Sequence, residues 1–103
     1  MNADQLVVFL ETQWADGELF DRLRVGVFSQ QQAGVFLECL RTAHLPLNED
    51  GVVPVRLLSI AWFIPLFLTW QKERVAEASG AVDDYARFLD EVFNILTDVL
   101  GAP

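Results

Sequence analysis

The sequence has little of the chemistry from which enzyme sites are built. Among its 103 residues there is one histidine, His44, and one cysteine, Cys39. A nucleophile activated by histidine, or a metal site with several histidines, therefore has almost nothing to draw on. The glycines are spaced as helix stops and turns, and the sequence contains no glycine-rich phosphate loop and no Glu-x-x-His pair. We therefore predict no catalytic residue, no cofactor and no metal site, in a protein that is not an enzyme.

The single cysteine also excludes an intrachain disulfide bond. A chain without a disulfide framework fits a reducing compartment. The residues after Met1 lack the basic start of a secretory signal, and Glu11 interrupts the first apolar stretch. These features predict a cytoplasmic protein, in which Cys39 is a small buried apolar residue of its helix.

Basic residues are scarce as well. Seven Lys and Arg stand against fifteen Asp and Glu, which gives a formal net charge of −8 and a pI near 4.3. Binding to phosphate backbones or anionic membrane surfaces depends on clustered Lys and Arg, so the composition argues against both. A partner, if there is one, is expected to be basic. The alternative is that the negative charge only keeps an apolar protein soluble.

No apolar run is long enough to predict a membrane span. The longest stretch without charge covers residues 57–70 and lies between Arg56 and Lys72, whereas a spanning helix needs about 20 apolar residues. A run that is apolar on every face is typical of a helix surrounded by other elements. We therefore expect a central buried helix at about 54–79, with Trp62 packed in the core.

Pro65 lies inside this central helix. A proline at such a position removes one backbone hydrogen bond and presses against the preceding turn. The sequence thus predicts a kink, or a break into two helices, at Pro65. Residues 71–78 are polar, so this end of the helix is expected to emerge into solvent, and Ser79-Gly80 ends it.

Apolar residues three and four positions apart predict the other helices. Asn2 is a start signal for the first helix, Asp16 is placed to cap the second, and Ser29 with Gln32 has the form of a capping box for the third. In the third helix the expected buried stripe comprises Val35, Phe36, Cys39, Leu40 and Ala43. In the last helix it comprises Val82, Tyr85, Phe88, Leu89, Val92, Phe93, Leu96, Val99 and Leu100.

No segment shows the alternation of apolar and polar residues that a half-buried strand requires. The one clear loop, residues 44–51, is too short to separate two folding units. We therefore predict an all-α fold, a single domain over residues 1–103 built as one compact bundle of about five helices.

The apolar content exceeds what a small bundle can bury. Hydrophobic residues make up 52% of the chain and aromatic residues 12%. Some of this surface is therefore expected to face a partner or a second copy of the chain, which favours a homodimer over a monomer.

The function that best fits these features is a non-catalytic, acidic protein-interaction module. Such a module binds a basic protein, in the manner of an immunity protein, an antitoxin or an inhibitor. Trp70 marks the point where the central helix becomes polar, and the acidic face of the last helix and the loop supply negative charge. The candidate partner-binding residues are Trp70, Asp84, Glu91, Asp98, Glu49 and Asp50. The alternative is a self-associating homodimeric scaffold, or a helical bundle that binds a small ligand.

Overall fold

The computed structural model describes residues 2–43 and 54–100, and within these ranges the chain forms six α-helices and no strand. The helices are α1 (Ala3–Thr12), α2 (Leu19–Leu23), α3 (Gln30–Thr42), α4 (Val55–Trp70), α5 (Lys72–Ser79) and α6 (Val82–Leu100). The all-α prediction is confirmed, with one helix more than expected. His44, Glu49 and Asp50 lie outside the described residues.

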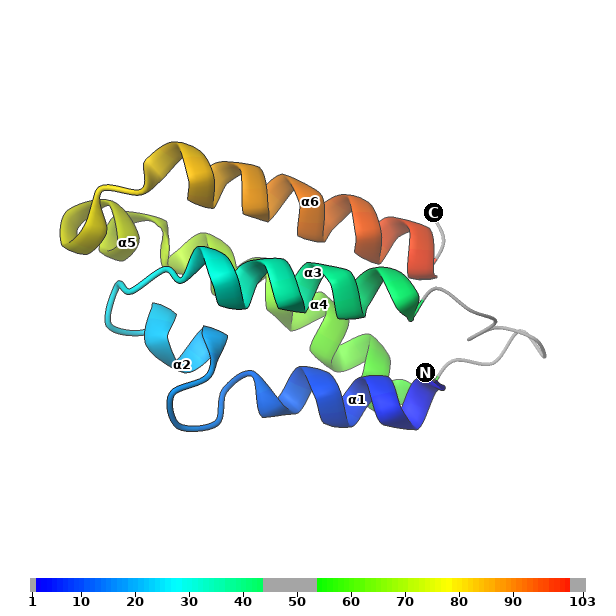
Figure 1. Ribbon diagram of the computed structural model, residues 1–103. Helices are drawn as coiled ribbons and strands as arrows, with labels where there is room; N and C mark the ends of the chain where they lie inside the picture. Colours follow the sequence, from blue (N-terminus) through cyan, green and yellow to red (C-terminus); the bar gives the residue numbers. More distant parts are fainter. Residues whose placement is uncertain (1, 44–53, 101–103) are drawn as a thin grey trace.

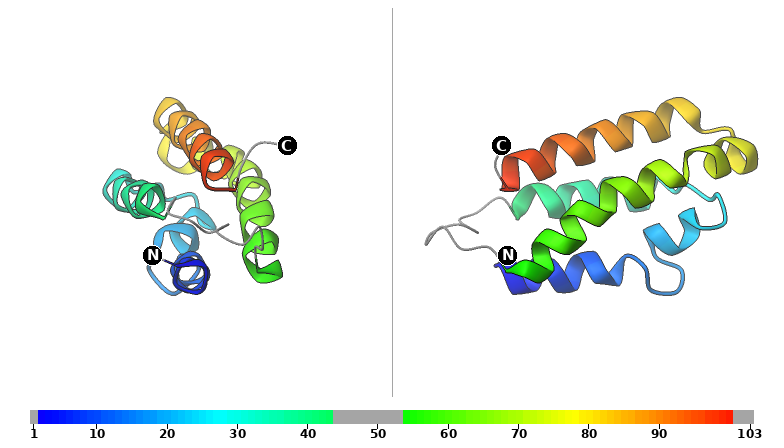
Figure 2. Two further views of the ribbon diagram at one scale, coloured as in Figure 1. Left: turned by 90° about the vertical axis from the view of Figure 1, so that its right-hand side faces the viewer. Right: turned by 180° about the vertical axis from the view of Figure 1, so that it is seen from behind.

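The helices pack as a bundle around one apolar cluster. In Figure 1, α3 and α6 run side by side, while α4 crosses behind them and packs against α6 and α1. The short helices α2 and α5 lie toward the end of the bundle opposite the start of α1. Seen from behind, α4 crosses the face with α6 on one side and α1 on the other, and no described element lies in front of it (Figure 2).

Local polar contacts explain where two of the helices begin. The Gln5 backbone N–H donates to Asn2 Oδ1 (2.8 Å), and Gln5 Oε1 accepts from the Asn2 N–H (2.9 Å), so α1 starts with a complete capping box. Before α3 only half of the predicted box is present. Ser29 Oγ accepts from the Gln32 N–H (3.2 Å), but Gln32 Nε2 donates instead to the Gly17 carbonyl (3.0 Å).

The predicted cap at Asp16 is wrong. Helix α2 begins at Leu19 with Glu18 at the N-cap position, and no side chain there accepts a cap hydrogen bond. Asp21, within α2, accepts from the Gly17 N–H at 2.9 Å and ties the preceding turn to the helix. A residue within the helix thus stabilises the turn. The prediction considered only residues before the helix and therefore missed Asp21.

The core is rich in leucine and aromatic rings. Phe20 and Phe36, both completely buried, lie with ring centroids 5.3 Å apart, and Phe88 continues the row 6.1 Å from Phe36. These rings come from α2, α3 and α6, so the row joins three helices. Contacts of this kind stabilise a core beyond the area that they bury.

The predicted stripe of α6 is largely confirmed, and that of α3 is confirmed in part. Tyr85, Phe88, Leu89, Val92 and Leu96 are buried, whereas Val82 and Phe93 are exposed. On α3 the buried residues are Ala33, Phe36, Leu37, Leu40 and Ala43. Val35 is exposed and Cys39 is half-buried, so the core face of α3 is turned by about one position from the predicted one.

The central helix is interrupted at Gln71 and not at Pro65, so the predicted break at the proline is wrong. Helix α4 runs through Pro65 without interruption. At its end the Gln71 N–H bonds to the Leu68 carbonyl (3.2 Å), three residues back instead of four, and α5 begins after this tightened turn. The buried Tyr85 hydroxyl of α6 also donates to the Leu68 carbonyl (2.6 Å), which satisfies an acceptor at the end of α4. The extra break produces the sixth helix.

Candidate protein-binding surface

One side of α4 is mostly apolar and uncovered, and Ser59 and Thr69 are its polar residues. Val55, Leu58, Trp62, Leu66 and Trp70 recur three or four positions apart along this side, and they define the α4 outer face. Trp62 is 79% exposed and Trp70 63% exposed. Between residues 55 and 70 the only charged side chain is Arg56, and it is held by an ion pair to Glu11 of α1 (3.2 Å).

The prediction of a completely surrounded helix with Trp62 in the core is therefore wrong. The buried side of α4 consists of Leu57, Ile60, Ala61, Ile64, Phe67 and Leu68. Trp62 lies on the opposite side, because it is two positions, or about 200° around the helix, from both Ile60 and Ile64. The other end of the helix agrees better with expectation, since Trp70 is exposed at the point where the chain becomes polar.

A groove runs between α4 and α6 beside the α4 outer face. Its volume is about 540 Å³, and it is open to solvent. Leu58, Trp62 and Pro65 form the α4 wall, and Phe93, Leu96 and Thr97 form the α6 wall. Phe93 is 47% exposed, so the uncovered apolar surface continues from α4 across the groove onto α6.

A second hollow lies on the other side of the α4 outer face, toward α1. It has a volume of about 490 Å³, and Trp14, Phe63 and Ser59 line it together with the ion-paired Arg56. Trp14, which the sequence places at a helix end, is half-buried against Phe20 (4.7 Å between centroids) and Phe67 (5.5 Å). The Trp70 ring rests edge-on against Phe63 at 5.9 Å, so the aromatic surface extends along α4 to its end.

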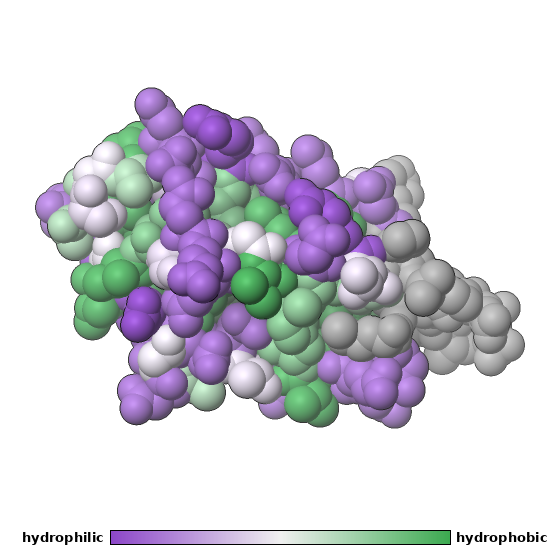
Figure 3. Space-filling view, viewed as in Figure 1, coloured by the Kyte–Doolittle hydropathy of each residue, from purple (hydrophilic) through white to green (hydrophobic). Residues whose placement is uncertain are grey.

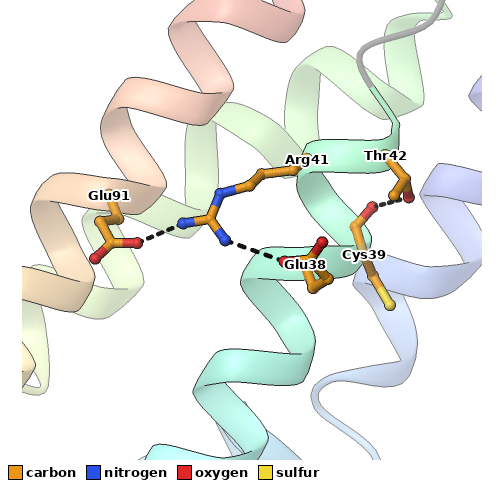
Figure 4. A network of polar contacts seen from close by, with 5 residues as sticks. All are labelled: Glu38, Cys39, Arg41, Thr42 and Glu91. Atoms are coloured by element: carbon orange, nitrogen blue, oxygen red, sulfur yellow. Dashed lines mark hydrogen bonds and ion pairs between the residues drawn. The ribbon is translucent and has the colours of Figure 1, made fainter.

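The predicted acidic residues of α6 do not form one site. Glu91 accepts from Arg41 of α3 (2.7 Å), which also pairs with Glu38 (3.3 Å), as Figure 4 shows. Asp84 lies 3.8 Å from Arg87 of its own helix. These two carboxylates already have cationic partners, whereas the structure shows no ion pair for the exposed Asp98 among the described residues.

Two further carboxylates lie on the exposed side of α6 that adjoins the groove wall, Asp90 three positions and Asp83 ten positions before Phe93. Asp83 and Asp90 are exposed, are seven positions apart on α6, and have no ion pair in the part of the chain that the structure describes. Asp90 precedes Phe93 by three positions and Thr97 by seven, which places it on the same side of the helix as the groove wall. We call Asp83 and Asp90 the acidic border of the groove.

The described residues contain no convergent reactive groups. No three of their metal-ligating side chains come together. The half-buried Cys39 is a lone thiol, and Thr42 donates a hydrogen bond to its backbone carbonyl, not to its sulfur (Figure 4). Burial raises the pKa of Tyr85 above its usual range. Its hydroxyl is bonded to the Leu68 carbonyl inside the core, so this phenol has a structural environment and not that of a proton donor in a cleft.

The face opposite α4 has a different character. In Figure 3 hydrophilic and hydrophobic residues are interspersed across the visible surface, with hydrophilic ones prevailing. Isolated exposed apolar residues such as Val35 of α3 are ordinary on protein surfaces. On the visible face, exposed apolar residues are thus separated by hydrophilic ones.

Among the described residues, no helix has both the length and the apolar character needed to cross a membrane. Comparisons with protein-family models, with curated proteins and with solved structures found no match to this chain.

Proposed function

We propose that this chain is a non-catalytic protein-interaction module that binds a basic protein through the α4 outer face and the adjoining groove. The observation behind this proposal is the exposure of Trp62 and Trp70 on one uncharged helix face. Tryptophan is enriched at the energetic centres of protein interfaces. Continuous apolar patches of this kind mark interaction sites more often than ordinary surface.

The size of the surface supports the same conclusion. The four exposed rings of Trp62, Phe63, Trp70 and Phe93 together present on the order of 500 Å². The apolar residues between them extend this area toward the roughly 800 Å² that each partner contributes to a stable interface.

Apolar contacts favour association with many apolar surfaces, so polar and charged contacts decide which partner binds. The chain has a formal net charge of −8. A partner of opposite charge is steered toward it and gains complementary contacts at the edge of the apolar surface. A basic protein therefore fits this surface better than a neutral or acidic one.

The proposal is tested by photo-crosslinking in the source cell. Trp62 is replaced by p-benzoylphenylalanine, and the same group is placed at Val35 as a control, which is 60% exposed on α3. We expect an adduct with a different, basic protein from position 62 and none from position 35. Equal labelling from both positions, or no adduct from position 62, would contradict the proposal.

Self-association through the same face is the second candidate. The α4 outer face contains no Asp or Glu between residues 55 and 70, so the two α4 faces would not themselves place carboxylates opposite each other. A two-fold symmetric dimer uses one such patch twice. In this case the photoreactive group at position 62 labels a second copy of the chain, and sedimentation at micromolar concentration shows a dimer that Trp62→Glu dissociates.

A further inference from the structure

We infer that the α4–α6 groove receives a single amphipathic helix from the partner, with basic residues along the flank that faces α6. This inference rests on the proposed function and specifies the partner segment. It follows from three properties of the groove, namely its backbone chemistry, its dimensions and the unequal charge of its two sides.

Backbone chemistry selects a helix. Both walls belong to α-helices, and Leu58 and Phe93 contribute side chains rather than free backbone groups. A segment that enters an apolar groove must therefore satisfy its own N–H and C=O groups, because unpaired polar groups are costly when buried. An extended peptide would need a sheet edge to pair with, and the described residues form no strand. A helix meets the requirement by itself.

The dimensions agree with a helix of about three turns. The α4 wall of the groove runs from Leu58 to Pro65, about 10 Å at a rise of 1.5 Å per residue. The exposed apolar positions continue beyond the groove to Trp70, about 18 Å from Leu58. A partner helix of about 12 residues covers this length with anchors at positions i, i+4 and i+7. Between the large side chains, Ser59 and Ala61 keep this stretch of the groove low, so that a helix backbone can approach closely.

Charge sets which way the partner helix faces. On the α6 side lies the acidic border, Asp83 and Asp90, without cationic partners among the described residues. On the α1 side the negative charge of Glu11 is already compensated by Arg56 at 3.2 Å. The carboxylates beside the α6 wall are thus uncompensated, whereas Glu11, which lines the hollow on the α1 side, is paired. This difference favours Lys or Arg on the flank of the bound helix that faces α6.

The same charges disfavour a second copy as the occupant. Each copy has a formal net charge of −8, and its α6 would carry the same acidic border into the interface. Like charges placed opposite each other reduce affinity. The acidic border attracts a basic helix, whereas it repels the acidic border of a second copy.

Three synthetic peptides test the inference with the full chain. The first is an 18-residue amphipathic helix with a Leu stripe and Lys on one flank, the second has Glu in place of Lys, and the third is the Lys peptide with a central proline. We expect the Lys peptide to bind in isothermal titration calorimetry, and the other two to bind about tenfold more weakly or not at all. Equal binding of the Lys and proline peptides would overturn the helical form of the ligand, and equal binding of the Lys and Glu peptides would overturn its charge.

Variants locate the binding to the groove. Phe93→Ala should weaken Lys-peptide binding by about tenfold. The double variant Asp83→Asn/Asp90→Asn should weaken it severalfold and flatten its salt dependence. The matched control is Asp84→Asn/Glu91→Gln, which also removes two carboxylates from α6, both of which already pair with arginines. If the control has the same effect as Asp83→Asn/Asp90→Asn, the peptide senses only net charge and the inference is wrong.

The crosslinking experiment separates the two levels of the proposal. If position 62 labels a foreign protein, mass spectrometry of the adduct identifies the segment that was labelled. A basic helical segment supports the inference, whereas an acidic or extended segment refutes the inference and leaves the proposed function in place. Labelling of only a second copy, or transfer of the label to lipid, refutes both.

Discussion

Helices α4 and α6 are of similar length, and both contribute to the core, but their apolar and polar residues are arranged differently. In α6 apolar and charged residues alternate with the helical period, so Tyr85, Phe88 and Val92 mark the buried side. In α4 large apolar side chains lie on both sides, such as the buried Ile64 and the exposed Trp62. In a helix with periodic apolar residues, the pattern indicates which face is buried. In a mostly apolar helix, one face packs in the core and the other remains exposed and available for binding.

A charged substitution should reveal the difference between the two sides of α4 most strongly, because its effect on stability depends on burial. Ile64 is completely buried, so Ile64→Asp forces a carboxylate into the core and should lower the free energy of unfolding by about 4 kcal/mol or more. Leu66, on the outer face, is 43% exposed, and Leu66→Asp should cost about 1 kcal/mol or less. Urea denaturation followed by circular dichroism measures both values. Similar losses for the two variants would mean that the outer face is not free.

This contrast also explains what could be predicted from the sequence. The stripe of α6 and the start of α1 at Asn2 follow from local patterns, and both agree with the structure. The exposure of Trp62 was mispredicted because the segment was judged by its lack of charge. The uncharged polar residues Ser59 and Thr69 are both exposed and lie on the same side of α4 as Trp62, so they were a weak signal of the outer face. The core face of α3 was misplaced by about one position, since Val35 and Phe36 are adjacent and equally apolar, and packing chose between them.

The candidate site was predicted less well than the fold. Trp70 was identified because the chain becomes polar after it. Glu91 follows the helical pattern of an exposed acid, but its partner Arg41 is fifty positions away in the sequence, and no local pattern indicates such a pair. Phe93 was predicted to belong to the buried stripe of α6, but this stripe contains more apolar residues than the core covers. That excess was the available signal that some of these residues are exposed.

The hydrogen bond from the Tyr85 hydroxyl of α6 to the Leu68 carbonyl of α4 is expected to be lost at alkaline pH. Burial raises the pKa of Tyr85 in the folded state above its usual value of about 10. The unfolded chain therefore loses this proton first, and the stabilising contribution, complete below pH 10, is lost progressively as the pH rises above 10. The chain contains one tyrosine, so tyrosinate absorbance should appear only together with loss of helical signal. Tyrosinate formation in a fully helical chain would contradict this assignment.

At neutral pH the substitution Tyr85→Phe tests the same hydrogen bond. This change removes the hydroxyl that donates to the Leu68 carbonyl (2.6 Å) and leaves the ring in place. We expect the free energy of unfolding to fall by about 1 kcal/mol, the usual net value of one hydrogen bond, because the Leu68 carbonyl still accepts from the Gln71 N–H (3.2 Å). The alkaline loss of stability should be reduced in this variant. An unchanged free energy of unfolding would show that the bond does not hold α4 to α6.

The smallest effect is expected on the outer face itself. Trp70 is 63% exposed, and its main contact is the edge of the Phe63 ring, so Trp70→Ala should change the free energy of unfolding by about 1 kcal/mol or less. Far-UV helicity should remain nearly unchanged, while partner binding weakens by about tenfold or more. If Trp70→Ala instead unfolds the chain, then Trp70 belongs to the core, and the two sides of α4 are less different than their exposure indicates. A variant that keeps both its fold and its partner affinity would instead confine the interface to Trp62 and the groove.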